Sequence, residues 1–224
     1  MSISNNINQI LSQITDNVKL VAVSKTKPVE DILEAYNGGY RIFGENKVQE
    51  LSNKFEVLPK DIEWHMIGHL QSNKVKFIAP FVSLIHAVDN YKLLKTINKE
   101  ALKNNRIINC LLQIHIAKEE TKFGFSLDEV SQMLEKEEAS SLTNVNIIGV
   151  MGMATFTDDN DVVGSEFQYL ANCLKELKSK YFNNKPDFKE LSMGMSGDYK
   201  IAVEKGSTII RVGSSIFGGR SYQI

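Results

Sequence analysis

One lysine of this chain stands where its amine could act as a nucleophile. Lys25 follows the short apolar run KLVAV and shares a face with Val21 and Val23 under the two-residue alternation of a strand. If that face points into a core, the amine is partly desolvated and gives up its proton more readily. Only the neutral amine attacks a carbonyl carbon, so Lys25 is a candidate Schiff-base lysine. Lys27 has the same parity as Lys25, so alternation alone does not choose between them. The alternative interpretation of Lys25 is a charged residue at the strand end whose amine reaches water.

Two glycine- and serine-rich segments near the end of the chain could bind an anion. SMGMSGD supplies Ser192 and Ser196, and RVGSS supplies Gly213 and Ser214. Small residues let backbone N–H groups approach a phosphate, and a following helix favours its negative charge. Each segment alone is equally consistent with an ordinary turn, but the two together favour an anion site.

Arg211 lies inside an apolar run, between Ile210 and Val212. An unpaired buried charge is costly, so this guanidinium needs a partner. Either it forms a structural salt bridge with a carboxylate, or its fork contacts a ligand.

The four histidines do not form a metal-binding pattern. His65 and His69 have the spacing of paired ligands on a helix, but their segment is predicted to be a strand broken at Gly68. No neighbouring cysteine or acidic cluster completes a site, so no metal is expected. His86 and His115 are interpreted as lone structural histidines.

Two further motifs follow predicted strands. FGEN places Glu45 and Asn46 after one strand, and TKFG places Lys122 and Gly124 after another. Both positions are also consistent with capping and turn chemistry. The chain contains no GxGxxG, Walker-type loop, GxSxG or paired-carboxylate motif.

Short apolar runs alternate with longer amphipathic ones, which predicts eight strands and intervening helices. Residues 91–104 should form a helix with Leu94, Ile97, Ala101 and Leu102 on one face, and residues 161–181 a second helix. Eight strands alternating with helices indicate a single-domain α/β (β/α)8 TIM barrel over residues 1–224, with an open doubly wound sheet as the alternative. The strands are predicted at 19–23, 41–44, 62–68, 84–88, 107–115, 146–153, 190–194 and 208–213.

The composition is that of a soluble globular protein. The 224 residues are 42% apolar and 24% charged, with a formal net charge of −1. A near-zero charge gives little support for nucleic-acid or membrane-surface binding. The N-terminus lacks a secretory pattern, and Cys110 and Cys173 lie in apolar contexts, so a cytoplasmic protein with reduced thiols is expected.

The motifs taken together resemble one family. VAVSKTKP, FGENKVQE, WHMIGHLQSNK, TKFG, LSMGMSGDY and RVGSSIFGG occur in order from about Val21 to Gly219. They resemble the pyridoxal phosphate homeostasis protein family, also called YggS-like or PROSC. The resemblance implies a barrel of the alanine-racemase type that binds pyridoxal 5′-phosphate (PLP) at its mouth.

The resemblance also implies roles for individual residues. Lys25, rather than Lys27, would form the Schiff base with the cofactor aldehyde. Asn46 would lie beside the ring, and Arg211 would face the pyridine nitrogen. The phosphate would be held by Ser196, Gly213 and Ser214, the last standing where many members have threonine. Lys122 would be an accessory lysine near the site.

The function implied is vitamin B6 homeostasis with little or no catalytic turnover. An arginine at the ring nitrogen weakens the ring as an electron sink, and eight βα units leave no room in this chain for the second domain of alanine racemases. A weak PLP-dependent racemase or related lyase is the alternative, and a phosphate-sugar barrel enzyme without PLP is a third possibility. A monomer is expected, with PLP-dependent apo-enzymes as possible recipients.

Overall fold

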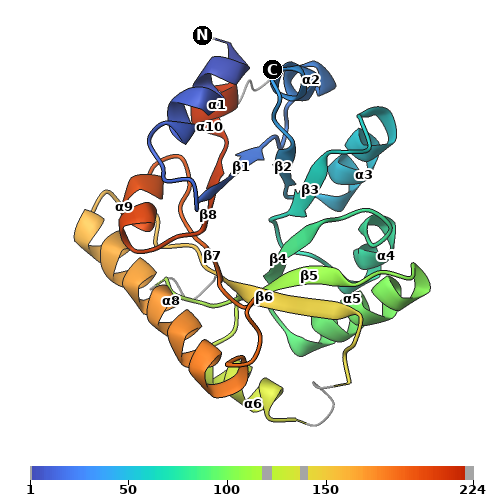
Figure 1. Ribbon diagram of the computed structural model, residues 1–224, viewed down its shortest axis with the longest axis vertical. Helices are drawn as coiled ribbons and strands as arrows, with labels where there is room; N and C mark the ends of the chain where they lie inside the picture. The colour runs from blue at the N-terminus through green and yellow to red at the C-terminus, as the bar shows by residue number, and fades with distance from the viewer. Residues whose placement is uncertain (1, 118–122, 137–140, 220–224) are drawn as a thin grey trace.

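Eight parallel strands close into a barrel in the order of the sequence (Figure 1). The computed structural model describes residues 2–117, 123–136 and 141–219. The strands are β1 (Lys19–Val23), β2 (Ile42–Glu45), β3 (Glu63–Met66), β4 (Leu84–Val88), β5 (Ile108–Gln113), β6 (Val145–Met151), β7 (Glu190–Ser192) and β8 (Ile209–Val212).

The predicted barrel is confirmed, and the open-sheet alternative is wrong. β1 pairs in parallel with both β2 and β8, so the sheet has no free edge there. All eight predicted strands are present, and β1 and β4 have the predicted bounds. The other strands differ from the predicted ranges only at their ends.

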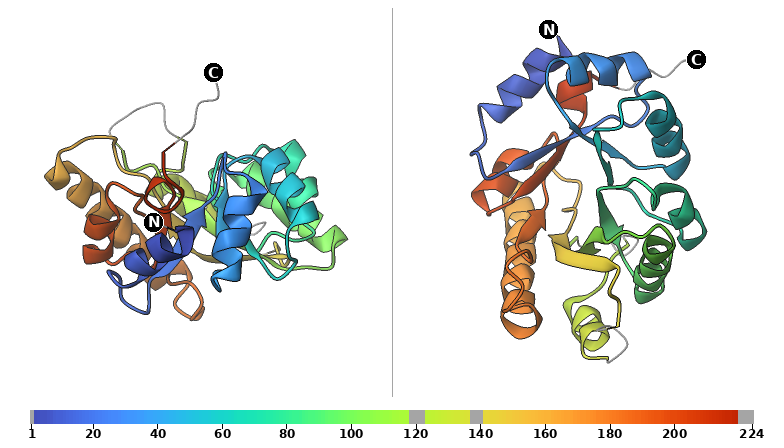
Figure 2. Two further views of the ribbon diagram at one scale, coloured as in Figure 1. Left: turned by 90° about the horizontal axis from the view of Figure 1, so that it is seen from above. Right: turned by 45° about the vertical axis from the view of Figure 1, so that its right-hand side comes forward.

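Helices surround the strands, with α2 to α5 along one side and α8 and α9 along the other (Figure 2). α1 lies beside α10, where the Asn6 amide donates to the Ile216 carbonyl at 2.8 Å. None of the helices in the described segments is long and apolar enough to cross a membrane. The helices are α1 (Ile3–Leu11), α2 (Val29–Asn37), α3 (Val48–Val57), η1 (Ser72–Lys74), α4 (Val75–Ile78), α5 (Tyr91–Lys103), α6 (Leu127–Leu134), α8 (Asn160–Tyr181), α9 (Tyr199–Glu204) and α10 (Ser214–Phe217).

Both predicted long helices are present, with one error in the face assigned to α5. Leu94, Ile97 and Ala101 are buried as expected, but Leu102 is 59% exposed. Successive helical residues differ by about 100°, so the residue after Ala101 has turned out of the apolar stripe. Leu93 occupies the fourth buried position instead.

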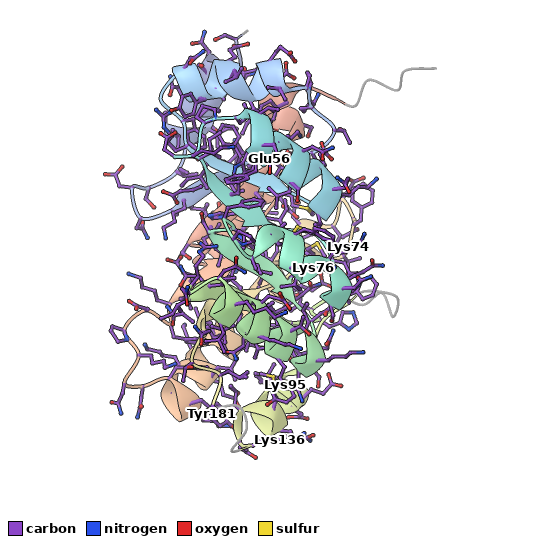
Figure 3. The ribbon with its side chains drawn as sticks, turned by 90° about the vertical axis from the view of Figure 1, so that its right-hand side faces the viewer. Glu56, Lys74, Lys76, Lys95, Lys136 and Tyr181 are labelled. Atoms are coloured by element: carbon purple, nitrogen blue, oxygen red, sulfur yellow. The ribbon has the colours of Figure 1, made fainter. Side chains whose placement is uncertain are left out.

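The strands bury two different surfaces. One face packs against the helices and forms the larger core, and the other lines the barrel around a smaller cluster that includes Val21, Leu111, Met151 and Ile209. Charged side chains lie mainly outside. Lys74, Lys76 and Lys95 mark the outer side of η1, α4 and α5 in Figure 3. A polar side chain inside the barrel is therefore an exception that needs an explanation.

Candidate functional site

Lys25 lies just beyond β1, two residues after the strand ends at Val23. Val21 belongs to the interior cluster, as the alternation predicted, and Lys25 is half-buried. The next residue, Thr26, has φ of 63°, a left-handed conformation that is uncommon for a β-branched residue. The chain therefore turns sharply at the end of β1, directly after the candidate nucleophile.

Lys27 is directed elsewhere. Its Nζ donates to the carbonyl oxygens of Phe217 and Gly219 at 2.8 and 3.0 Å. These two hydrogen bonds hold the Lys27 amine beside the segment after α10. The Lys27 amine thus has two backbone partners, and the choice of Lys25 over Lys27 stays a prediction.

A buried ion cluster supports the turn that carries Lys25. Lys54 of α3 donates to Glu45, to Glu50 and to the Ser24 carbonyl at 2.8, 2.7 and 2.8 Å. Glu50 also accepts the Thr26 N–H at 2.6 Å. Burial raises the pKa of Glu45, while Lys54 acts in the opposite direction. Glu45 therefore has a structural position behind the strands, and the turn is tied to α3.

Asn46 lies at the mouth, immediately after β2, and is half-buried. Its backbone and Cβ fit closely against Gly68, where an added Cβ would come within 2.4 Å of the Asn46 carbonyl oxygen. A glycine after β3 is therefore required for this approach. Asn46 and His69 line a common pocket of about 360 Å³.

His65 and His69 do not share a face. His69 lies past the end of β3, where its Nδ1 is 2.8 Å from Asp89 and its ring stacks on Phe123 with 4.1 Å between centroids. His65 is buried inside the barrel. The break predicted at Gly68 explains this separation.

The loops after β7 and β8 meet. The Ser196 hydroxyl accepts the Gly213 N–H at 3.2 Å. A Cβ at Gly213 would lie 3.1 Å from the Val23 carbonyl oxygen, and one at Gly194 only 2.6 Å from Cβ of Ala202. Gly194 also has φ of 93°. Glycine thus allows the loop after β8 to approach β1 and the loop after β7 to approach α9, although the phosphate role of these residues stays a prediction.

Ser214 is exposed at the first turn of α10. The first N–H groups of a helix have no partner within the helix, so they are available to an acceptor. Lys122, the predicted accessory lysine, lies outside the described residues.

Arg211 is buried, with 4% of its surface exposed. Its Nη1 donates to the Ser192 hydroxyl at 2.5 Å and its Nη2 to the Gly152 carbonyl at 3.1 Å. It forms no salt bridge with any carboxylate of the described residues. Burial lowers its pKa to about 10, while nearby Asp198 acts to raise it. Of the two alternatives for Arg211, the structural salt bridge is therefore not found among the described residues.

The sequence interpretation missed a polar chain behind Arg211. His86 Nδ1 lies 2.9 Å from the Ser192 hydroxyl, and His86 Nε2 lies 3.0 Å from His65 Nδ1. His86 was interpreted as a lone histidine, which is wrong. The available signal was that all four side chains interrupt apolar strands, yet alternation gives only the face of a strand and not its neighbours across a barrel.

Comparison with known proteins places this barrel in a class. The family model described as the alanine racemase N-terminal domain matches residues 1–221. The alanine racemase of Bartonella henselae has the same fold, with a TM-score of 0.72 at 13% identity over 100% of this chain and 61% of that one. The class is thus the alanine-racemase-type barrel.

Closer relatives define the family. The pyridoxal phosphate homeostasis protein of Aquifex aeolicus is 40% identical over 91% of this chain and 88% of its own length. PipY of Synechococcus elongatus, solved with PLP bound, has a TM-score of 0.87 at 34% identity and is matched over 96% of this chain and 100% of its own. This chain belongs to the pyridoxal phosphate homeostasis protein family.

Proposed function

We propose that this protein binds pyridoxal 5′-phosphate reversibly on Lys25 and acts in intracellular vitamin B6 homeostasis, with little or no catalytic turnover. The observation that carries the proposal is the placement of a half-buried lysine at the same end of the barrel as two glycine-rich loops that contact each other. The likeness to PipY, whose structure holds PLP, supports the identity of the ligand.

The residues at the mouth fit this cofactor. When bound, PLP supplies an aldehyde that forms a Schiff base with an amine, a phosphate, and an aromatic ring. Lys25 would hold the aldehyde end, and Asn46 would lie beside the ring. The phosphate end would be held by Ser196, Gly213 and Ser214, since small residues at the start of α10 let backbone N–H groups approach an anion.

Arg211 would hold the opposite end of the ring. A guanidinium has only N–H donors, so Arg211 would keep the pyridine nitrogen as an unprotonated acceptor. Arg211 donates to a hydroxyl and a carbonyl, both neutral, so no carboxylate of the described residues is hydrogen-bonded to the guanidinium. An unprotonated ring stabilises a carbanion poorly, which favours a carrier over an enzyme.

The competing function is that of a weak PLP-dependent racemase or related lyase. Such chemistry needs an acid or base on the face of the substrate opposite the lysine. The two functions are separated by the rate at which added amino acids lose their α-proton, measured by deuterium exchange. Exchange at enzymatic rates that disappears in Lys25→Ala would establish the enzyme.

The direct test of binding is borohydride reduction followed by mapping of the modified peptide. We expect the adduct on Lys25 and its loss in Lys25→Ala. Lys27→Ala is the matched control, because it removes a lysine two residues away that donates to Phe217 and Gly219. An adduct that persists in Lys25→Ala would contradict the proposed attachment.

We further propose a monomeric protein of the cytoplasm that supplies PLP-dependent apo-enzymes. The experiment is transfer of PLP from the loaded protein to an apo-enzyme across a dialysis membrane and in direct mixture. Equal rates would indicate free release, and faster transfer in the mixture would indicate contact.

A further inference from the structure

Four buried side chains form a continuous line of hydrogen bonds across the barrel interior. The line runs from Arg211 of β8 to Ser192 of β7, His86 of β4 and His65 of β3, with steps of 2.5, 2.9 and 3.0 Å. Their exposed fractions are 4%, 0%, 0% and 4%. Three of these residues, Ser192, His86 and His65, have no part in the binding roles proposed above.

The direction of the line follows from its first member. Arg211 can only donate, so the Ser192 oxygen accepts at that step. The Ser192 hydroxyl hydrogen then needs an acceptor, because a buried unpaired donor is costly, and His86 Nδ1 is the ring nitrogen within reach. His86 must therefore carry its proton on Nε2, which donates to Nδ1 of His65. Both imidazoles are the Nε2–H tautomer.

Both imidazoles are also neutral. Burial lowers the pKa of His65 to about 3, with a smaller contribution from Lys19, and burial lowers the pKa of His86 well below its usual range, with His65 and Arg211 adding to the effect. A protonated His86 would have no lone pair for Ser192 and would face a guanidinium through one hydroxyl. The neutral state is the one that the geometry accommodates.

We propose that His65 and His86 are positioning residues that act through Ser192 to orient Arg211 and to hold it with neutral acceptors alone. This inference rests on the proposed function, because the group that Arg211 is oriented toward is the cofactor ring. A carboxylate in place of the line would satisfy the same N–H group but would neutralise the charge. With neutral hydrogen-bond acceptors, the charge of Arg211 is offset, among the described residues, only by Asp198, which makes no hydrogen bond to it, and more of it remains available to the ring nitrogen.

The first test uses the protein without cofactor. The chain has four histidines, so long-range proton–nitrogen spectra of the imidazoles can be assigned by single substitutions. We expect the neutral Nε2–H tautomer at both His65 and His86 from about pH 6 to about pH 8. This range is chosen because an ordinary histidine changes its protonation state within it. An Nδ1–H tautomer or an imidazolium at His86 would overturn the proposed line.

The second test uses loaded protein and PLP labelled with 15N in its ring. His86→Leu removes the acceptor for Ser192, whereas His86→Asn keeps an oxygen near the position of Nδ1. We expect a changed ring-nitrogen shift and about five- to tenfold weaker retention of PLP in His86→Leu, the effect of about one hydrogen bond. His86→Asn should restore both. Equal behaviour of wild type and both variants would overturn the positioning role.

Ser192→Ala is a second variant that interrupts the same line of hydrogen bonds. If His86→Leu does not fold, Ser192→Ala breaks the same line with the loss of one oxygen, and the same shift is expected. If the wild type takes up no PLP, the proposed function is overturned, and with it the role of the line in orienting Arg211 toward the cofactor ring. The tautomers measured without cofactor would still decide the direction of the line.

Discussion

Lys54 and Arg211 are both buried cations, but they are held by different kinds of partner. The Lys54 ammonium group donates to two carboxylates and one carbonyl, all within 2.8 Å. Arg211 donates to a hydroxyl and a carbonyl, and no described carboxylate lies within salt-bridge distance. The Lys54 charge is hydrogen-bonded to carboxylates, whereas the Arg211 charge is hydrogen-bonded only to neutral groups of the described residues, with Asp198 acting on it from outside hydrogen-bond distance.

The difference corresponds to position. The Lys54 cluster lies between the outer faces of β1 and β2 and α3, where it ties down the turn after Lys25. Arg211 lies inside the barrel, on the face that leads to the mouth. A neutralised ion cluster fixes a backbone segment. A cation whose hydrogen-bond partners are neutral can still attract an electron-rich atom of a ligand. In the proposed binding mode, the aldehyde end of the cofactor would lie at Lys25, beside the turn that the neutralised cluster fixes. The ring nitrogen would lie at Arg211, whose hydrogen-bond partners are neutral.

The largest effect is expected where the neutralised cluster is broken. Lys54→Met leaves the Glu45 carboxylate, whose side chain is 0% exposed, without its cation. Removing one partner of a buried pair typically costs about 3–5 kcal/mol. We expect a fall of that size in the free energy of unfolding, measured by denaturant titration.

Lys103→Met is the matched control for that substitution. Lys103 pairs with Glu100 at 2.7 Å, but its side chain is 56% exposed. An exposed pair contributes about 0–1 kcal/mol. Equal losses in the two variants would mean that the Lys54 cluster is solvated and does not stabilise the turn.

A smaller effect is expected from the line behind Arg211 when the pH falls. The pKa of His65 is lowered from 6.5 to about 3 in the folded protein, so the unfolded chain binds more protons below pH 6.5. Stability is therefore complete above about pH 6.5 and is lost as the pH falls toward 3. The loss for His65 is about 1.4 kcal/mol per pH unit, or about 2 kcal/mol at pH 5.

The measurement is the free energy of unfolding from pH 7.5 to 5 in wild type and His65→Asn. The variant should show a shallower decline. His69→Asn removes a half-exposed histidine and serves as the control. Parallel curves for wild type and His65→Asn would contradict neutral burial of His65.

The contrast between the two cations also shows how far the sequence could be interpreted. The strands were predictable because apolar and β-branched runs are short and regularly spaced, and the meeting of the β7 and β8 loops followed from the barrel itself. Val21 could be placed on the interior face because β1 alternates regularly, and the inward direction of Lys25 stays a prediction from the same pattern. These predictions needed only the order of residues along one strand.

The polar line needed more than that order. β4 has a register irregularity between Ile85 and Val88, and both Leu84 and Ala87 belong to the interior cluster. Alternation from Leu84 gives the face of His86 but fails at Ala87, and no local pattern pairs His86 with Ser192, 106 positions away. Lys54 was missed for a similar reason, because a lysine on an amphipathic helix is ordinarily solvent-exposed.

Removal of Arg211 should affect stability less than removal of Lys54. Arg211→Met leaves two acceptors short of a donor, but it also removes a desolvated charge, and these contributions oppose each other. We expect a change of about 1 kcal/mol in unfolding free energy, together with weaker PLP retention and an altered absorption spectrum. Arg211→Lys keeps a charge without the fork and should recover only part of the binding. An unaltered spectrum at full occupancy would mean that Arg211 does not face the ring.

The smallest effect is expected at the turn that the Lys54 cluster supports. Thr26 has φ of 63°, and its N–H is bound by Glu50 at 2.6 Å. Thr26→Gly relieves about 1–2 kcal/mol of left-handed strain but adds about 0.5–1 kcal/mol of backbone entropy to the unfolded state, so a net gain of about 0.5–1 kcal/mol is expected. Asn105→Gly, at φ of 52°, is the matched control, because asparagine tolerates this conformation and should gain less. Equal gains at both positions would show that Thr26 stores no particular strain. A gain at Thr26 accompanied by slower adduct formation on Lys25 would show that the cluster holds a strained turn to aim the lysine.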